Sequence, residues 1–279
     1  MNGPITRKEF LSTAKTAIAA ASVGAIGMAA VEASGQSRQM PLTAPTAAAI
    51  PPWPWPYRKL DTEDVRKRAH KAYYDGGCGY GAFSGLLGAL IDVVGEPFTL
   101  MPPQIMYFAG GGGAGWGTLC GALNGSATLI NLVVDRTNAN SIIGELFGWY
   151  TEAPFPSDIS NDYAQRRVFL VNRNDRALQQ TQAGSPLCHA SVSSWCTETH
   201  YAASSAERAE RCARLTGDVA ARAVELLNAF ADGNFRAVFR QTTWTTGCQS
   251  CHSGHIANVQ STVKMNCPQC HNDSWKHTY

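Results

Sequence analysis

Apolar side chains recur with a helical period through the middle of the chain. At the spacing i, i+3, i+4, i+7, i+8 and i+11, one face of a predicted helix is formed by Phe83, Leu86, Leu87, Leu90, Ile91 and Val94. The segment 119–133 is apolar almost all round, which predicts a central helix. A third stripe runs from Leu215 to Phe230, and the capping-box pair Ser204 and Glu207 predicts where its helix begins.

These stripes and weaker patterns indicate a mainly α chain. Helices are also expected near 61–75, 139–151 and 187–199, and strand alternation is scarce. The predicted architecture is a multi-helical, cysteine-containing domain over 59–235, followed by a short, irregular segment over 236–279. A proline-rich lead-in over 34–58 precedes the domain, and Trp53 and Trp55 are candidates to anchor it.

The N-terminus has the pattern of an export signal. Arg7 and Lys8 precede a run of small apolar residues over 17–31. The Arg-Lys pair before Glu-Phe-Leu resembles the twin-arginine motif, with lysine in place of the second arginine. We expect residues 1–33 to be removed and the mature chain to be soluble in the periplasm or another extracytoplasmic compartment. No later segment reaches the roughly 20 apolar residues that span a bilayer, so no transmembrane segment is expected there.

Composition argues against several classes of function. The 279 residues carry a formal charge of +2, and the 16% that are charged are nearly balanced in sign, so a nucleic-acid partner is not expected. Residues 110–115 formally match GxGxxG, but no βαβ pattern surrounds them, so the match is weak evidence for a nucleotide site. Nine cysteines, an odd number, direct attention to cysteine chemistry.

The C-terminal tail contains two CxxCH motifs. They are Cys248-Gln249-Ser250-Cys251-His252 and Cys267-Pro268-Gln269-Cys270-His271. Two cysteines at this spacing can form thioether bonds to the vinyl groups of one haem, and the following histidine then binds the iron on the proximal side. The sequence therefore predicts two haem c groups, held covalently by Cys248, Cys251, Cys267 and Cys270, with His252 and His271 as proximal ligands.

Two other interpretations of the tail stay open. Without the histidines, the four cysteines also have the spacing of a four-cysteine zinc site. An exported protein could instead form two disulfides. The histidine after each pair and the export signal favour haem. The candidate distal ligands of the two irons are His255 and His277, followed by His70 and His189, and a ligand from a second subunit is an alternative.

The five remaining cysteines are Cys78, Cys120, Cys188, Cys196 and Cys212. Three of them, Cys78, Cys120 and Cys188, follow glycine or proline at predicted helix starts, where the helix dipole is expected to lower the thiol pKa. Several thiolates meeting among buried helices would suit an iron–sulfur cluster. Buried free cysteines that merely pack, or disulfides, are the alternatives.

Four segments carry a resemblance to a known family. They are Gly-Gly-Cys78-Gly-Tyr-Gly, Cys120-Gly121-Ala122-Leu-Asn-Gly125, Leu187-Cys188-His189-Ala-Ser-Val and Arg211-Cys212-Ala-Arg-Leu-Thr-Gly. They resemble the redox-active C-GCAxxG-C-C family and, together with the two CxxCH motifs, the split-Soret cytochrome c family. That resemblance implies a homodimer, two bis-His haems per chain stacked near the dimer interface, and an iron–sulfur cluster, [2Fe-2S] or another type. The implied cluster ligands are Cys78, Cys120, Cys188 and Cys212, with Cys196 as the alternative.

The leading hypothesis from the sequence is an exported dihaem c-type cytochrome that exchanges electrons with redox partner proteins. Bis-His ligation would leave no open iron position, so we expect an electron carrier more than an enzyme with its own substrate. The second hypothesis is an oxidoreductase that uses haem or cluster on a small molecule. The third is a zinc-stapled structural or interaction module.

Overall fold

The computed structural model describes residues 51–252 and 263–267. The predicted export signal 1–33 and most of the proline-rich lead-in lie outside this part of the chain. The same is true of His255, Cys270, His271 and His277 in the tail. The export signal and these ligands therefore stay predictions.

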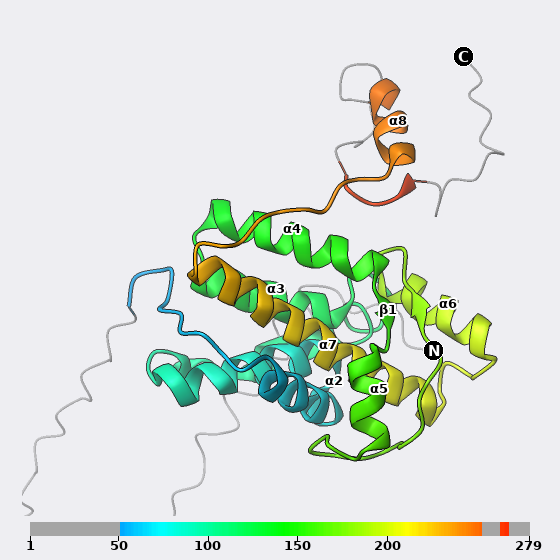
Figure 1. The fold of residues 1–279 in the computed structure, drawn as a ribbon, viewed down its shortest axis with the longest axis horizontal. Coiled ribbons are helices and arrows are strands. Elements are labelled where there is room, and N and C mark those ends of the chain that lie inside the picture. Colours follow the sequence, from blue (N-terminus) through cyan, green and yellow to red (C-terminus); the bar gives the residue numbers. More distant parts are fainter. Residues whose placement is uncertain (1–50, 253–262, 268–279) are drawn as a thin grey trace, which may run out of the picture. The chain divides into compact units, whose positions relative to one another are not determined.

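The described chain is helical, as the sequence predicted (Figure 1). Its helices and short strands, in order, are α2 (Thr62–Val94), η1 (Phe98–Leu100), η2 (Pro103–Ala109), α3 (Gly121–Val133), α4 (Arg136–Glu152), β1 (Pro154–Phe155), α5 (Asp158–Gln165), β2 (Thr181–Gln182), α6 (Cys188–Thr199), α7 (Ala206–Ala231) and α8 (Thr243–His252). The two strands form one antiparallel pair, with Pro154 opposite Gln182 and Phe155 opposite Thr181.

Helix α2 joins two helices that the sequence predicted separately. Asp61 caps its N-terminus by accepting a hydrogen bond from the backbone N–H of Asp64 at 2.7 Å. The join lies at Gly76 and Gly77, whose backbone angles are not helical, with φ +81° at Gly77. A new helical turn therefore starts at Cys78. By length and composition α2 could cross a membrane, although the sequence analysis expected no such segment. In this structure α2 packs against α3 and α7 in the core.

Several other boundaries differ from expectation. Helix α7 is capped by Ser205, not by Ser204, since the Ser205 hydroxyl accepts a hydrogen bond from the Arg208 backbone N–H at 3.1 Å. The segment 103–109 forms the 3₁₀ helix η2. Helices α5 and α8 were not predicted, and α8 lies within the tail that was expected to be irregular.

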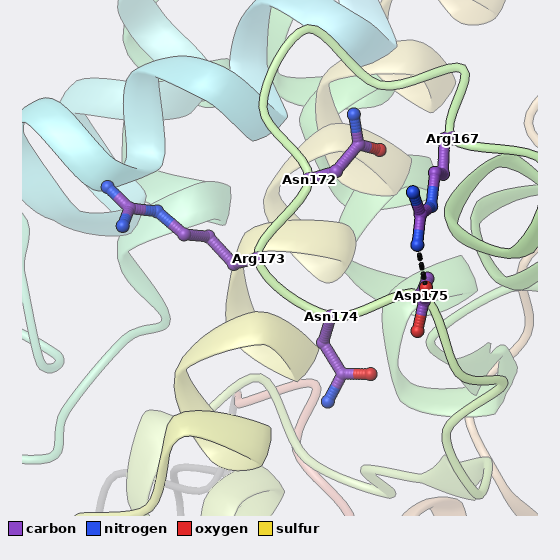
Figure 2. A pocket seen from close by; sticks show the side chains of 5 residues that line it. All are labelled: Arg167, Asn172, Arg173, Asn174 and Asp175. Atoms are coloured by element: carbon purple, nitrogen blue, oxygen red, sulfur yellow. Dashed lines mark hydrogen bonds and ion pairs between the residues drawn. The ribbon is translucent and has the colours of Figure 1, made fainter.

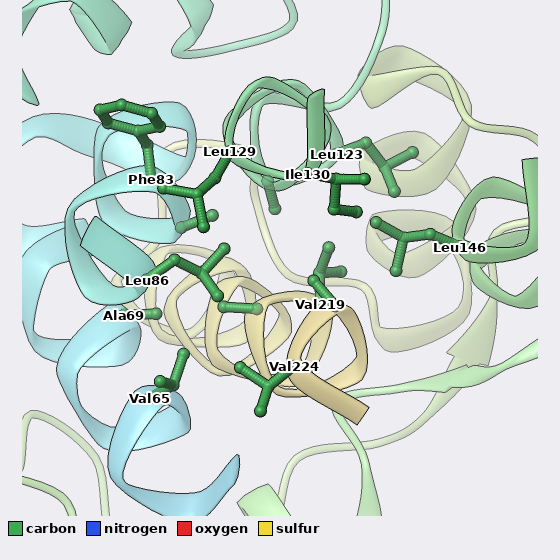
Figure 3. Close-up of a cluster of buried hydrophobic side chains, with 14 of the residues drawn as sticks. Val65, Ala69, Phe83, Leu86, Leu123, Leu129, Ile130, Leu146, Val219 and Val224 are labelled. Atoms are coloured by element: carbon green, nitrogen blue, oxygen red, sulfur yellow. The ribbon is translucent and has the colours of Figure 1, made fainter. Parts of the chain in front are cut away.

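The core is formed by the apolar faces of α2, α3, α4 and α7 (Figure 3). Its fully buried side chains include Val65, Ala69, Phe83, Leu86, Leu123, Leu129, Ile130, Leu146, Val219 and Val224. The end of the lead-in packs on this core through Trp55, which is 7% exposed and meets the Phe98 ring edge-on at 5.4 Å. The Trp53 indole donates to the Asn131 carbonyl at 2.6 Å, so both tryptophans anchor the lead-in as predicted.

Helices α2 and α3 approach so closely that glycine is required at their contact. A Cβ atom at Gly125 would lie 2.4 Å from the Gly79 carbonyl oxygen and 2.9 Å from the Phe83 backbone nitrogen. Both contacts are with backbone atoms, which cannot rotate away as a side chain would. The Gly in the sixth position of the Cys120–Gly125 motif therefore fixes the distance between the two helices.

Two buried arginines in the core have carboxylate partners. Arg66 pairs with Asp218, which also accepts hydrogen bonds from Ser157 and Ser160. Arg214 pairs with Glu210 at 2.8 Å. Since an unpaired charge is costly in the interior, these pairs satisfy the expectation that buried charges are compensated.

The start of the tail is attached to α4 by a buried carboxylate. Glu145, 4% exposed, accepts hydrogen bonds from the backbone N–H groups of Val238 and Phe239, both at 2.8 Å. The Phe239 ring lies against Gly148, where a Cβ atom would be 2.1 Å from the ring. These contacts fix the path of the chain from α7 toward α8.

Candidate metal and electron-transfer site

Four helices bring four cysteines into one neighbourhood. Cys78 follows the kink in α2, Cys120 is the N-cap residue of α3, Cys188 is the first residue of α6, and Cys212 lies within α7. The Cys78 thiol interacts electrostatically with those of Cys120, Cys212 and Cys188. These four are the cysteines that the sequence motifs singled out. All four are free thiols.

Cys196 differs from these four. It lies about two turns beyond Cys188 on α6 and interacts electrostatically with Arg208. It is a free thiol of intermediate exposure. The four residues of the sequence motifs therefore define the cysteine cluster, a name used below for Cys78, Cys120, Cys188 and Cys212.

Backbone pairing holds two members of the cysteine cluster together. The Cys120 N–H donates to the Pro186 carbonyl at 2.9 Å, and the Cys188 N–H donates to the Thr118 carbonyl at 2.7 Å. Leu119 and Leu187 face each other in an antiparallel bridge between these bonds. Because main-chain groups make the link, the spacing of Cys120 and Cys188 does not depend on the side chains between them.

Glycines let the backbone approach the thiols closely. A Cβ atom at Gly121 would lie 2.4 Å from the Cys78 sulfur, so only glycine leaves room for that thiol. Gly112, with φ +72°, would place a Cβ atom 2.7 Å from the Cys188 Cβ atom. The glycine run that formally matched GxGxxG therefore forms turns beside the cysteines.

The predicted acidic thiols are not found, and this is a correction. Burial raises the pKa of Cys78 and Cys120, and burial together with the neighbouring Cys120 and Cys212 raises the pKa of Cys188 to about 12. The helix starts are where the sequence placed them, but the loss of water and the repulsion that neighbouring thiolates would exert outweigh the effect of the helix dipole. These three thiols are therefore neutral at pH 7 unless a bound cation favours the thiolate.

Positive charge lies beside the cysteine cluster. The Arg211 side chain is 1% exposed, donates to the Ser191 hydroxyl at 2.9 Å, and has no hydrogen-bond partner at Nε. It interacts electrostatically with Cys188. Arg208, which is partly exposed, lies beside Cys212. A site with this surrounding favours negatively charged ligands.

Two phenols complete the surroundings of the thiols. The fully buried Tyr150 hydroxyl lies beside the Cys120 thiol without a hydrogen bond of normal geometry. Tyr73 interacts with Cys212, Cys78 and Cys188, and burial is the main cause that raises its pKa. Within residues 51–252 and 263–267, no three Cys, His, Asp or Glu side chains are arranged as a metal coordination sphere. The thiols are thus close enough to interact electrostatically, but they do not form a ready set of metal ligands.

The first CxxCH motif occupies the end of α8, with His252 as the last residue of the helix. Cys248 and Cys267, the first cysteines of the two motifs, lie side by side; burial and the proximity of Cys248 raise the pKa of Cys267. The second motif after Cys267 lies beyond the described part of the chain. The two haem-attachment segments therefore start next to each other.

The two secondary candidates for distal haem ligands have other surroundings. His70 is fully buried; its Nε2 atom lies 3.2 Å from Glu210, and its ring stacks on Phe169 at 3.7 Å. His189 is the second residue of α6, and its Nδ1 atom lies 3.5 Å from the Ser193 hydroxyl. His70 is thus engaged within the helical core.

A cavity of about 750 Å³ lies between α4 and the first part of the tail. Leu119 and Leu187, neighbours of Cys120 and Cys188, line it together with residues of α4. Thr245 of α8, Phe239 and Lys264 line its other parts. Its volume lies in the range of about 300–1,000 Å³ that is typical of ligand pockets.

A second hollow lies in the loop between α5 and β2 (Figure 2). Arg167, Asn172, Arg173, Asn174 and Asp175 line it. Arg167 is paired with Asp175 at 2.6 Å, and the Arg173 guanidinium lies over the Tyr74 ring at 5.3 Å. No cysteine or histidine is among its lining residues, so we assign it no role in the redox site.

The fold and the cysteine cluster define a class of helical, cysteine-containing redox proteins. Residues 84–226 match the family described as "Putative redox-active protein (C_GCAxxG_C_C)". Over 252 residues, 88% of each chain, the sequence is 33% identical to split-Soret cytochrome c of Desulfovibrio desulfuricans. The chain therefore belongs to the C_GCAxxG_C_C family and is a homologue of split-Soret cytochrome c.

A solved structure agrees with this assignment. It is described as "A novel iron centre in the split-Soret cytochrome c from Desulfovibrio desulfuricans ATCC 27774". The similarity covers 78% of this chain and 90% of that chain, with a TM-score of 0.71 and 35% identity. The resemblance drawn from the sequence motifs is thus confirmed, as is the mainly helical fold, and the homology supports a redox role in electron transfer.

Proposed function

We propose that this chain is an exported dihaem c-type cytochrome that transfers electrons and holds an additional iron centre in its helical domain. The iron centre would be bound by Cys78, Cys120, Cys188 and Cys212. The haem groups would be attached at the two CxxCH motifs, with His252 and His271 on the proximal side and His255 and His277 as distal candidates. Bound there, the iron groups would supply one-electron chemistry.

The observation that carries the iron centre is the charge arrangement at the cysteine cluster. Four free thiols from four helices, two of them buried and two half-buried, interact electrostatically beside Arg211, which is buried without a carboxylate partner among the described residues. With neutral thiols this guanidinium would be an uncompensated buried charge. Four thiolates on iron would supply the missing negative charge, so the chemistry of the donors and their surroundings suits iron, and the four side chains would move closer together to bind it.

The lining of the cavity favours electron exchange between the iron centre of the helical domain and the haems of the tail. Leu119 and Leu187 line the cavity and adjoin Cys120 and Cys188, whereas Thr245 lies three residues before Cys248 on α8. Residues of the cavity wall thus connect the cysteine cluster with the first haem-attachment motif. Apolar side chains there would exclude water from a macrocycle and lower the cost of moving an electron near it.

The remaining parts of the proposal rest on sequence and on homology. The N-terminal pattern supports export to the periplasm, where c-type haem is attached. The similarity to split-Soret cytochrome c supports a homodimer that exchanges electrons with partner proteins. Whether the centre is [2Fe-2S] or another iron centre is decided by the metal and sulfide content.

A second candidate is a zinc-bound tail. The sulfur atoms of Cys248 and Cys267 lie side by side, and this arrangement would also suit one ion held by the four tail cysteines. Homology to a cytochrome favours haem over zinc. Zinc without covalent haem in the purified protein would establish the alternative.

Metal analysis and spectroscopy test the proposal directly. The full chain is produced in a host that matures c-type cytochromes, and haem is counted by the pyridine haemochrome spectrum. We expect two haems per chain and iron in excess of two. C188S should lose the excess iron and keep the haem spectrum, whereas C196S should keep both. No iron beyond the haems in the wild type would refute the iron centre, and no covalent haem would refute the cytochrome.

A further inference from the structure

Arg211 differs from the other buried arginines of the described chain. Arg66 has Asp218 as its partner, and Arg214 has Glu210. No ion pair of Arg211 with a carboxylate is present in residues 51–252 and 263–267. Its side chain is as buried as theirs, at 1% exposure, and its Nε atom has no hydrogen-bond partner. A buried cation of this kind persists when a negative group compensates it.

The position of Arg211 points to the compensating group. Its guanidinium donates to the Ser191 hydroxyl at 2.9 Å, and Ser191 lies one turn beyond Cys188 on α6. In the sequence, Arg211 directly precedes Cys212 on α7. The side chain therefore bridges the two helices that carry Cys188 and Cys212.

We propose that Arg211 is the charge-balancing residue of the iron centre and raises its reduction potential. This inference rests on the iron centre proposed above. An iron centre held by four thiolates would be anionic, and one added electron would make it more negative by one charge, with no bond formed or broken. A fixed positive charge in a poorly solvated site stabilises the more negative, reduced form. Arg211 acts through the iron ligands and is therefore a positioning residue, not a catalytic one.

The test measures the midpoint potential of the iron centre in the full haem-containing protein. Dithionite supplies the electrons, electron paramagnetic resonance follows the iron centre, and visible absorption follows the haems. R211M removes the charge, R211K keeps it, and R211Q is the second charge-removing variant if R211M does not fold. R167M is the matched control, since it removes an exposed guanidinium that pairs with Asp175.

In R211M or R211Q we expect at least a tenfold smaller equilibrium constant for reduction, which is about 59 mV for one electron. R211K and R167M should stay close to the wild type, and the haem potentials should change little. A folded R211M that loses the non-haem iron, while R211K retains it, also supports the role of the charge. An unchanged potential in the charge-removing variants overturns the inference, as does loss of iron in both R211M and R211K. Absence of non-haem iron from the wild type refutes the iron centre itself, which is a separate result.

Discussion

The close contact between α2 and α3 predicts opposite changes in the free energy of unfolding for two glycine-to-alanine substitutions. Gly125→Ala places a methyl group 2.4 Å from the Gly79 carbonyl oxygen and 2.9 Å from the Phe83 nitrogen. Gly88→Ala, on α2, places one 3.7 Å from the end of the Arg68 side chain. Both glycines lie within helices and neither has a positive φ, so the local backbone effect of alanine is the same.

The magnitudes follow from two terms. Alanine is more favourable than glycine inside a helix by about 1 kcal/mol. At Gly125 this gain is opposed by overpacking, which costs about 1–3 kcal/mol and reaches the upper end here because both obstructing atoms belong to the backbone. G125A should therefore lower the free energy of unfolding by about 2 kcal/mol. G88A should raise it by up to about 1 kcal/mol.

Thermal unfolding followed by far-ultraviolet circular dichroism measures both effects. For a chain of this size, about 1 kcal/mol corresponds to about 2–4 °C in Tm. We expect Tm to fall by about 4–8 °C in G125A and to rise by up to about 4 °C in G88A, with equal metal and haem loading. Equal stability of the two variants, or a more stable G125A, would refute the close contact as the reason for glycine at position 125.

Three further predictions concern buried carboxylates. Asp218→Asn removes the buried counter-charge of Arg66 and leaves only the half-buried Glu63 as its partner, so it should destabilise the fold by about 3 kcal/mol in denaturant unfolding, and an effect below about 1 kcal/mol would contradict the pairing. Burial opposes ionisation of Glu210, but His70, Tyr74 and Arg214 lower its pKa overall, so its contribution to stability is present above about pH 4.5 and is lost as pH falls further; the free energy of unfolding of E210Q should fall less than that of the wild type between pH 5 and pH 3. Equal falls in the two proteins would argue against this role of Glu210. Glu145→Ala removes the acceptor for Val238 and Phe239 and should speed proteolysis between α7 and α8 without loss of non-haem iron; unchanged cleavage would show that other contacts hold the segment.

The helical parts of the fold were predictable because their apolar stripes are long. The stripe that ends at Val94 and the one that ends at Phe230 both correspond to observed helices. The join at Gly77 was not predicted, since two glycines ordinarily end a helix, whereas here the chain resumes the helix around Cys78. Short α5 has too few residues to show a clear period.

The members of the cysteine cluster could be named from their motifs, but their chemistry could not. Proximity to a helix start is visible in sequence, and it predicted a lowered pKa for Cys188. Burial beside Cys120 depends on the tertiary structure, and it raises that pKa instead. The same holds for Arg211. Glu207 lies four residues before Arg211, as Glu210 lies four residues before Arg214, but within the described residues only the second of these pairs forms an ion pair.

The distribution of the cysteine cluster over α2, α3, α6 and α7 has a consequence for biogenesis. No single hairpin or pair of neighbouring helices contains all four sulfur atoms, so the chain must be synthesised through Cys212 before they can meet. A chain that ends before Cys212 offers at most three of them. Iron loading of this domain would thus report that synthesis had passed Cys212 and that the four helices had come together.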